Sequence, residues 1–334
     1  MLKKVLKYLG FLILILIIIY FLGPKVDPPN LSSKLPIIGD NLSEINNLIL
    51  KQNQDKNIRE GNHSRIIWAD SVPEKTEYSV VYLHGFSASP VENEVIYSNF
   101  SKRYHTNLYA PRLFEHGLKS KEPLSNFTGE GYINSAKEAI AIGMKMGEKV
   151  ILFCTSTGAT AGLYLSANHP EIEALILVSP NVEIYDTTSN LITKPWGKEI
   201  LKTAMGGNYQ TWQPPNEAEK YWYAKYRIEA IIQLKSLIQA TMKKETFEKI
   251  KQPFFMAYYY ENEEEQDKVV SVERMLEMFE QTSTPSNLKV KKTFPNAKNH
   301  SLASRFFNPN FLKVQDEIFN FTETVLNIKP TKNE

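Results

Sequence analysis

The chain begins with one long apolar run, and only short apolar runs follow it. Residues 8–24 (YLGFLILILIIIYFLGP) carry no charge, and Lys3, Lys4 and Lys7 precede them. An uninterrupted apolar stretch of this length is at the short end of the range of about 17–25 residues that cross a bilayer as a helix. It also lacks the polar face of a helix that packs on a soluble core. The run predicts a transmembrane segment over residues 1–24.

The residues at the end of this run favour a retained anchor over a cleaved signal peptide. Cleavage requires small side chains before the cut, whereas Tyr20, Phe21 and Leu22 are bulky and only Gly23 is small. A cleaved signal is the alternative interpretation. Because the lysines precede the helix, the positive-inside rule keeps the N-terminus in the cytoplasm. We expect a single-pass membrane protein whose remaining chain lies on the extracytoplasmic side.

Strand-like and helix-like patterns alternate after the apolar run. Residues 25–43 hold Pro and Ser clusters and are interpreted as a linker, and residues 44–55 as a short amphipathic helix. Strand-like runs lie at 64–70, 78–83, 107–111, 149–154, 172–178, 254–260 and 288–294. Helical patterns lie at 90–105, 133–147, 157–169, 271–282 and 310–327. This alternation predicts an α/β domain with a mostly parallel central sheet and helices on both faces.

The alternation stops at residues 187–250, which lack a convincing strand and carry helical patterns, including 218–241. An insertion of this size between two strands predicts a helical cap over one edge of the sheet, within a single domain spanning 44–330. The cap is rich in aromatic residues: Trp196, Trp212, Tyr221, Trp222, Tyr223 and Tyr226. These rings either form a wall for an acyl chain or an aromatic leaving group, or only pack the cap onto the core.

Charge and composition exclude several function classes. The 334 residues include 39 Lys+Arg and 37 Asp+Glu, so the net charge is +2 and argues against a nucleic-acid partner. The single cysteine, Cys154, excludes an intramolecular disulfide and a Cys-based zinc cage. No histidine pair has metal-ligand spacing, and Gly206-Gly207 is not followed by the residues of a phosphate-binding loop. We expect neither a metal nor a cofactor.

The first candidate for chemistry is the run Cys154-Thr155-Ser156-Thr157-Gly158, where a buried strand meets a helix of small residues. A serine on a sharp strand-to-helix turn is held exposed, and small neighbours two residues before and after it let strand and helix approach. Gly158 meets this need, whereas Cys154 stands where such turns usually have glycine. Because hydroxyl residues also precede helices as caps, this motif alone is weak evidence for catalysis.

Backbone groups near this serine can stabilise an oxyanion. His84-Gly85-Phe86 follows the strand at 78–83, and its loop can supply the N–H of Phe86, while the helix start can supply the N–H of Thr157. The alternative interpretation is a plain turn after the strand.

Two more candidates lie late in the chain. Asp267 follows the strand at 254–260, and His300 follows the strand at 288–294. In open α/β sheets, sites form at the carboxyl ends of the strands. The order Ser156, Asp267, His300 is the one expected for a nucleophile, an acid and a base built on such a sheet.

Taken together, these pieces resemble the α/β-hydrolase superfamily and, within it, the monoacylglycerol lipase and carboxylesterase group. The similarity spans roughly residues 60–328 and keeps the family's order. The matching pieces are YLHGFSASP at 82–90, LYAPRLFEHG at 108–117, KVILFCTSTG at 149–158, EALILVSP at 173–180, QDKVVS at 266–271 and NAKNHS at 296–301. The resemblance implies Ser156 as nucleophile, His300 as base, Asp267 as orienting acid, and Phe86 with Thr157 as the oxyanion hole.

The sequence departs from the family's pattern at two places. Cys154 replaces the first glycine of the serine motif. The loop at 260–266 (YENEEEQ) is longer than usual, which makes Glu263, Glu264 and Glu265 rival acids. We prefer Asp267, because the Lys-Val-Val that follows it matches the family and the glutamates have the pattern of a solvated charge run.

The resemblance implies a serine hydrolase that cleaves carboxylic esters, small or lipid, through an acyl-enzyme; its substrate-binding residues are not assigned. Aminopeptidases and acyltransferases of the same fold are alternatives, and Glu217 and Glu219 of the cap are available to hold a substrate amine. A non-catalytic binding protein on this scaffold is a further alternative, which the intact set of Ser156, Asp267 and His300 disfavours.

Overall fold

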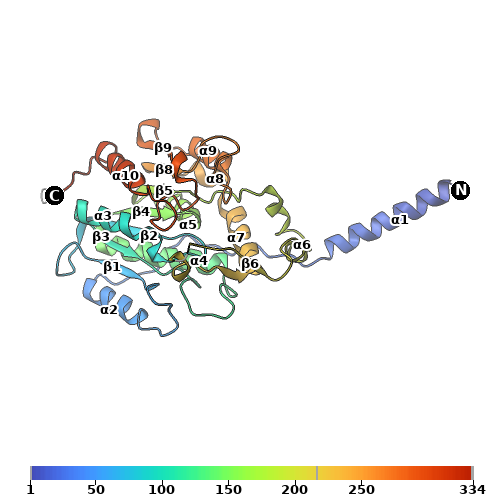
Figure 1. Cartoon of the computed structure of the whole chain (residues 1–334), viewed down its shortest axis with the longest axis horizontal. Coiled ribbons are helices and arrows are strands. Elements are labelled where there is room, and N and C mark those ends of the chain that lie inside the picture. Colours follow the sequence, from blue (N-terminus) through green and yellow to red (C-terminus); the bar gives the residue numbers. More distant parts are fainter. Residues whose placement is uncertain (1, 216, 332–334) are drawn as a thin grey trace.

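A seven-stranded sheet forms the centre of the molecule in the computed structural model, which describes residues 2–215 and 217–331 (Figure 1). The strand order is β1-β3-β2-β4-β5-β8-β9. The strands are β1 (Arg65–Ile67), β2 (Thr76–Leu83), β3 (Asn107–Ala110), β4 (Gly147–Thr155), β5 (Ile172–Val178), β8 (Phe254–Tyr258) and β9 (Lys289–Thr293). Only the edge strand β1 runs antiparallel to its neighbour. The predicted mostly parallel sheet is therefore confirmed.

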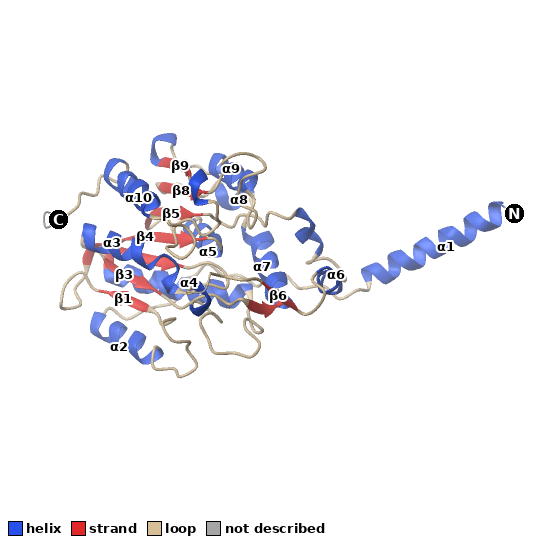
Figure 2. Ribbon diagram, viewed as in Figure 1, coloured by secondary structure: helices blue, strands red, loops and turns tan. Residues whose placement is uncertain are grey.

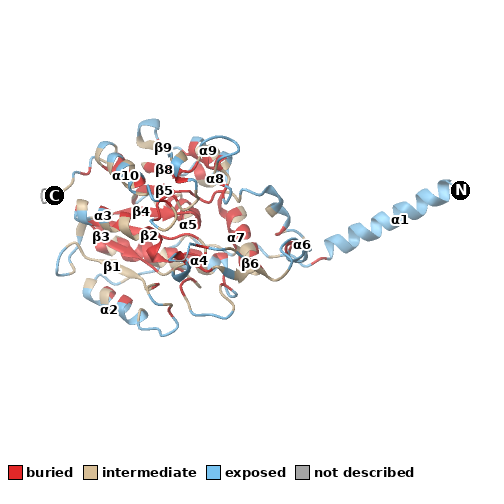
Figure 3. Ribbon diagram, viewed as in Figure 1, coloured by how far each residue is buried: buried red, intermediate tan, exposed pale blue. Residues whose placement is uncertain are grey.

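Helices cover both faces of the sheet (Figure 2). They are α2 (Leu42–Gln52), α3 (Glu94–Tyr104), α4 (Gly129–Met146), α5 (Thr157–Ser166), α8 (Lys244–Phe247), α9 (Val272–Gln281) and α10 (Leu312–Thr324). Successive residues of a strand point to opposite faces. Val81 of β2 accordingly packs in the core beneath α4 and α5, while its neighbour Val80 packs in the core beneath α3 and α10. Two-sided burial explains why the central strands β5 and β8 are almost wholly apolar, whereas the edge strand β9 (KVKKT) is largely exposed (Figure 3).

The cap at 187–250 is less helical than the sequence predicts. It contains two 3₁₀ turns (Thr187–Leu191 and Ala218–Lys220), α6 (Gly197–Ala204), α7 (Ile228–Thr241) and the short α8, and also two antiparallel strands, β6 (Tyr209–Thr211) and β7 (Lys225–Arg227). The expected helix at 218–241 therefore begins only at Ile228. Aromatic residues favour extended backbone, and Lys225 and Arg227 of β7 lie over the ring of Tyr209 on β6.

The N-terminal helix α1 (Leu2–Phe21) projects away from the domain, and none of its residues is buried (Figures 1 and 3). Its mean hydropathy is 2.2 over 18 residues, and it is long and apolar enough to cross a membrane. A retained anchor and a signal sequence share these properties. The segment between α1 and α2 has neither helix nor strand, and its Leu31, Leu35 and Ile38 pack against the core.

Candidate active site

Ser156 occupies a strained turn between β4 and α5. Its φ of 52° lies in the left-handed region that side chains rarely adopt, and its N–H donates to the Val178 carbonyl at 2.9 Å. A Cβ at position 158 would lie 2.0 Å from the Leu83 carbonyl oxygen, so only glycine lets α5 approach β2 this closely. The structure thus has the strand–turn–helix that the sequence predicts around Ser156.

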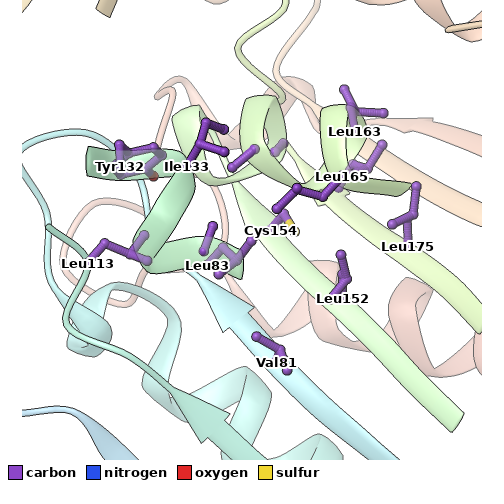
Figure 4. Packing of buried hydrophobic residues seen from close by; sticks show 14 of the residues in the cluster. Val81, Leu83, Leu113, Tyr132, Ile133, Leu152, Cys154, Leu163, Leu165 and Leu175 are labelled. Carbon is purple, nitrogen blue, oxygen red and sulfur yellow. The ribbon is translucent and has the colours of Figure 1, made fainter. Parts of the chain in front are cut away.

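Cys154 fits into this turn because a glycine faces it. The thiol is fully buried among the core residues drawn in Figure 4. A Cβ at position 162 on α5 would lie 2.7 Å from the Cys154 sulfur, so Gly162 leaves the room that the larger side chain takes. Burial raises the pKa of the Cys154 thiol, which stays protonated and has a packing role.

Three candidate side chains meet at the carboxyl edge of the sheet. His300 Nε2 lies 3.0 Å from Ser156 Oγ, and His300 Nδ1 lies 2.6 Å from Asp267 Oδ2. Asp267 is buried, and its other oxygen accepts from the N–H groups of Val269 (2.8 Å) and Val270 (3.1 Å). The loops after β8 and β9 therefore bring acid and imidazole to the serine turn, with the imidazole between the hydroxyl and the carboxylate.

Opposing effects set the pKa of His300. Burial lowers it, but the negative charge of Asp267 and the hydrogen bond to it outweigh the burial, and the charge of Glu92 adds to them. The net effect raises the pKa of His300 above its ordinary value. An imidazole in this setting is a stronger base toward the serine proton.

The rival acids in the loop at 260–266 lie elsewhere. Glu263 accepts from the hydroxyl of Tyr260 at 3.0 Å, and Glu265 from the hydroxyl of Tyr259 at 3.1 Å. Glu264 and its two neighbours are exposed, and the hydrogen bonds described for them join residues of the same loop and Tyr259. The geometry favours Asp267.

The backbone N–H groups of Phe86 and Thr157 have no hydrogen-bond partner within the described parts of the chain. Both residues line the cavity that contains Ser156. Two such donors beside the serine hydroxyl can stabilise an oxyanion.

Two buried histidines hold the loop that carries Phe86. His84 donates from Nδ1 to the Gly85 carbonyl and accepts at Nε2 from the Leu113 N–H. His116 accepts at Nε2 from the Ser87 N–H at 3.0 Å. Burial lowers the pKa of both rings, that of His116 to about 4, so both are neutral and structural.

A buried carboxylate, Glu92, also lines the cavity, and sequence patterns did not indicate it. It accepts from the Gly85 N–H at 2.7 Å and from the Tyr82 hydroxyl at 2.8 Å. Burial raises its pKa. Glu92 lies in an unremarkable run, SASPVENEV, and only the fold brings it beside Ser156.

The cavity above Ser156 has a volume of about 580 Å³. Its cap side is mostly apolar, with Met205, Trp212, Trp222, Tyr226, Ile231 and Leu234. Half of the six cap aromatics therefore form a wall, whereas Trp196, Tyr221 and Tyr223 are not among the described lining residues. Neither Glu217 nor Glu219 belongs to the lining that the structure describes.

Comparisons with solved structures identify the fold. A metagenome-derived lipolytic enzyme (LipS or LipT) superposes with a TM-score of 0.64 at 13% identity, over 79% of this chain and 98% of the other. The monoacylglycerol lipase of Paleococcus ferrophilus gives 0.57 at 15% identity, over 78% and 97%. A soluble variant of monoglyceride lipase from Saccharomyces cerevisiae gives 0.56 at 11% identity, over 78% and 91%. The chain has the α/β-hydrolase fold.

The expected resemblance to the α/β-hydrolase superfamily is thereby confirmed at the level of fold. No protein-family model matches the chain, and no curated protein matches it. Within this α/β-hydrolase fold, Ser156, Asp267 and His300 follow β4, β8 and β9, all at the carboxyl edge where this kind of sheet binds ligands.

Proposed function

We propose that the protein is a serine hydrolase that cleaves carboxylic esters. The observation that carries this proposal is the hydrogen-bonded series from Ser156 Oγ through His300 (3.0 Å) to buried Asp267 (2.6 Å). The solved structures with this fold include proteins described as lipases and monoacylglycerol lipases, which supports an ester as substrate.

In the proposed reaction, His300 Nε2 takes the proton of Ser156 as Oγ attacks the ester carbonyl. The Phe86 and Thr157 N–H groups donate to the resulting oxyanion. Asp267 keeps the proton on Nδ1 and stabilises the imidazolium. The imidazolium gives its proton to the departing alcohol, leaving an acyl-enzyme. Water then attacks the acyl group while His300 takes its proton, and the proton returns to Ser156 as the acid leaves.

An ester suits this cavity better than the amine-bearing substrate of an aminopeptidase. The carboxylate in the described lining is Glu92, and it already accepts two hydrogen bonds, from the Tyr82 hydroxyl and the Gly85 N–H. Its lining also includes the cation Lys268. A mostly apolar wall fits an acyl chain or an aromatic group.

We also propose that α1 stays attached and holds the hydrolase domain on the extracytoplasmic side of a membrane. The support is its apolar length, the three lysines before it and the bulky residues at its end. Sequencing the N-terminus of the mature protein from membranes tests this directly, because a cleaved signal would leave a chain that starts after α1.

Covalent labelling tests the catalytic assignment. Ser156→Ala should abolish reaction with a fluorophosphonate probe and ester hydrolysis, because the attacking oxygen is gone. Ser125→Ala, in an exposed loop, is the matched control and should label normally. Persistent labelling of the Ser156 variant would refute the assignment. A panel of p-nitrophenyl esters of graded acyl length, run beside aminoacyl amides, separates an esterase from a peptidase.

A further inference from the structure

The end of α1 is fixed to the cap. The N–H of Trp196 donates to the Pro24 carbonyl at 2.9 Å, and its indole N–H donates to the Ile19 carbonyl at 3.0 Å. Gly23 is buried against the same indole, where a Cβ would lie 2.2 Å from the ring nitrogen. Val26 then packs on a small cap cluster of Ile192, Leu201, Ile228 and Ile232. The helix therefore leaves the domain beside α6 (Figure 2).

The segment after this junction is tied along the domain. The Ser32 carbonyl accepts from Lys137 at 3.1 Å, and the Ser33 carbonyl is hydrogen-bonded to His169 Nε2 at 2.7 Å. Asp40 pairs with Lys145 at 2.5 Å. Because the chain is held on both sides of the helix exit, the direction of α1 relative to the domain is set. If α1 crosses a bilayer, the cap is the part of the domain next to that bilayer.

The cap exposes large apolar side chains at this end. Leu191 is 50% exposed, Trp196 36%, Ile200 42% and Met205 43%; we call these four residues the cap patch. On α6, Leu201 turns inward and is buried, whereas its neighbour Ile200 stays exposed. Single exposed apolar residues are ordinary, but four within residues 191–205 mark an interaction surface.

The charges around the cap patch suit anionic headgroups. Lys25, Lys194, Lys198 and Lys202 lie on the same segments, with Asp186 and Glu199 as the nearby acids in sequence. Lys198 pairs with Glu229 at 2.9 Å, and Glu229 is also held by Arg227. Apolar side chains bordered by lysines are typical of surfaces that rest at the boundary between headgroups and acyl chains.

We propose that the cap patch lies in the headgroup–acyl boundary of the bilayer that α1 crosses. This inference rests on the membrane anchoring proposed above. Met205 belongs both to the cap patch and to the lining of the cavity above Ser156. Val269, on the loop that carries Asp267, is likewise exposed and lines that cavity. The cavity therefore reaches the membrane surface, and an ester whose acyl chain lies in the bilayer enters it from there.

Fluorescence quenching on the full chain in vesicles tests this contact. Ile200→Cys carries an environment-sensitive fluorophore, and Leu312→Cys, at an exposed position of α10, is the matched control. The native Cys154 is buried, so the label attaches to the introduced thiol. In phosphatidylcholine vesicles containing phosphatidylglycerol, lipids brominated near the headgroup should quench the Ile200 label several-fold more than the Leu312 label. Equal quenching in vesicle-bound protein overturns the proposal.

Carbonate extraction of the same vesicles tests the membrane anchoring by α1 separately from the contact between the cap patch and the bilayer. Protein that stays in the membrane but shows equal quenching overturns the cap contact alone. Release by carbonate overturns the anchoring, and the cap contact with it. If the unsubstituted chain hydrolyses no ester, the esterase proposal fails while the quenching result still decides the cap contact.

A substrate comparison gives a second readout. Leu191→Ser combined with Ile200→Ser should lower the rate on a long-chain ester embedded in vesicles roughly tenfold, because apolar contact with the bilayer is lost. Neither residue lines the cavity, so hydrolysis of a water-soluble short ester should change less than about twofold. Leu312→Ser should change neither rate. An equal loss on both esters, or no loss on either, contradicts the proposal.

Discussion

Two carboxylates act on His300 in different ways. Asp267 is hydrogen-bonded to its Nδ1 at 2.6 Å, whereas Glu92 acts on it only through its charge. The Glu92 carboxylate accepts its hydrogen bonds from the Gly85 N–H and the Tyr82 hydroxyl. At the scale of single residues, Glu92 therefore holds the loop that carries Phe86 and places negative charge near His300.

Glu92→Gln should shift the pH profile. The proposed base works only as neutral imidazole, so kcat/KM rises as pH passes upward through the pKa of His300. Removing the nearby negative charge lowers that pKa, and the acid limb should move to lower pH by up to about one unit. Glutamine can still accept from the Gly85 N–H. Glu94→Gln, in a surface pair with Arg65, is the control, and an unshifted limb in the Glu92 variant would contradict this role.

The turn between β4 and α5 depends on the close approach of α5 to β2 and β4. Gly158 allows α5 to meet the end of β2, and Gly162 faces Cys154 one helical turn later. At the scale of elements, the substitution of cysteine for the usual glycine is matched by an absent side chain on the facing helix. The two positions form one packing unit.

A double-mutant cycle tests this unit. Gly162→Ala should destabilise the protein by about 1–3 kcal/mol, because its Cβ would lie 2.7 Å from the Cys154 sulfur. Cys154→Ala removes a buried sulfur and should cost about 1 kcal/mol. The double variant should cost less than the sum, since alanine at 154 makes room. Urea unfolding in detergent measures each variant, with Gly207→Ala as control because nothing lies near its Cβ. Strict additivity would rule out the pairing.

At the scale of the whole molecule, an ion pair joins the cap to the domain that carries the sheet. Lys235 of α7 is fully buried and pairs with Glu183, which lies in the loop after β5. A buried ammonium without its partner costs several kcal/mol of stability. The position of the cap on the domain therefore contributes to the free energy of unfolding. Residues of the same cap line the cavity above Ser156.

Breaking the two sides of this pair should have unequal effects. Glu183→Ala leaves the buried Lys235 ammonium without a partner and should lower the free energy of unfolding by about 3 kcal/mol or more. Lys235→Met replaces the cation with an apolar side chain of similar length and should cost clearly less. Glu248→Ala, from the exposed pair with Lys244, should have little effect. Thermal or urea unfolding of the three variants gives the order, and equal costs for the first two would contradict this account.

Much of the architecture could be predicted because it is encoded locally. Apolar runs of strand length, helical spacing and punctuating turns lie within short stretches, so the parallel sheet and the apolar α1 follow from the pattern. The motif around Ser156 requires a strand, a tight turn and a small residue at 158, all within a few positions. The loops that carry Asp267 and His300 could be placed at one sheet edge, while their catalytic roles remain predictions.

Only the tertiary structure shows the features that depend on contacts between residues far apart in the sequence. His300 and Ser156 are 144 residues apart, and only the route of the loop after β8 brings Asp267, and not Glu263 or its neighbours, to the imidazole. The cap's β6 and β7 pair although residues 212–224 separate them along the chain, which no single-segment pattern reveals. Likewise, the fit of Gly162 to Cys154, the approach of Glu92 and the attachment of α1 to the cap arise from packing between segments. Local propensity does not encode such contacts, because each requires a partner that only the folded chain supplies.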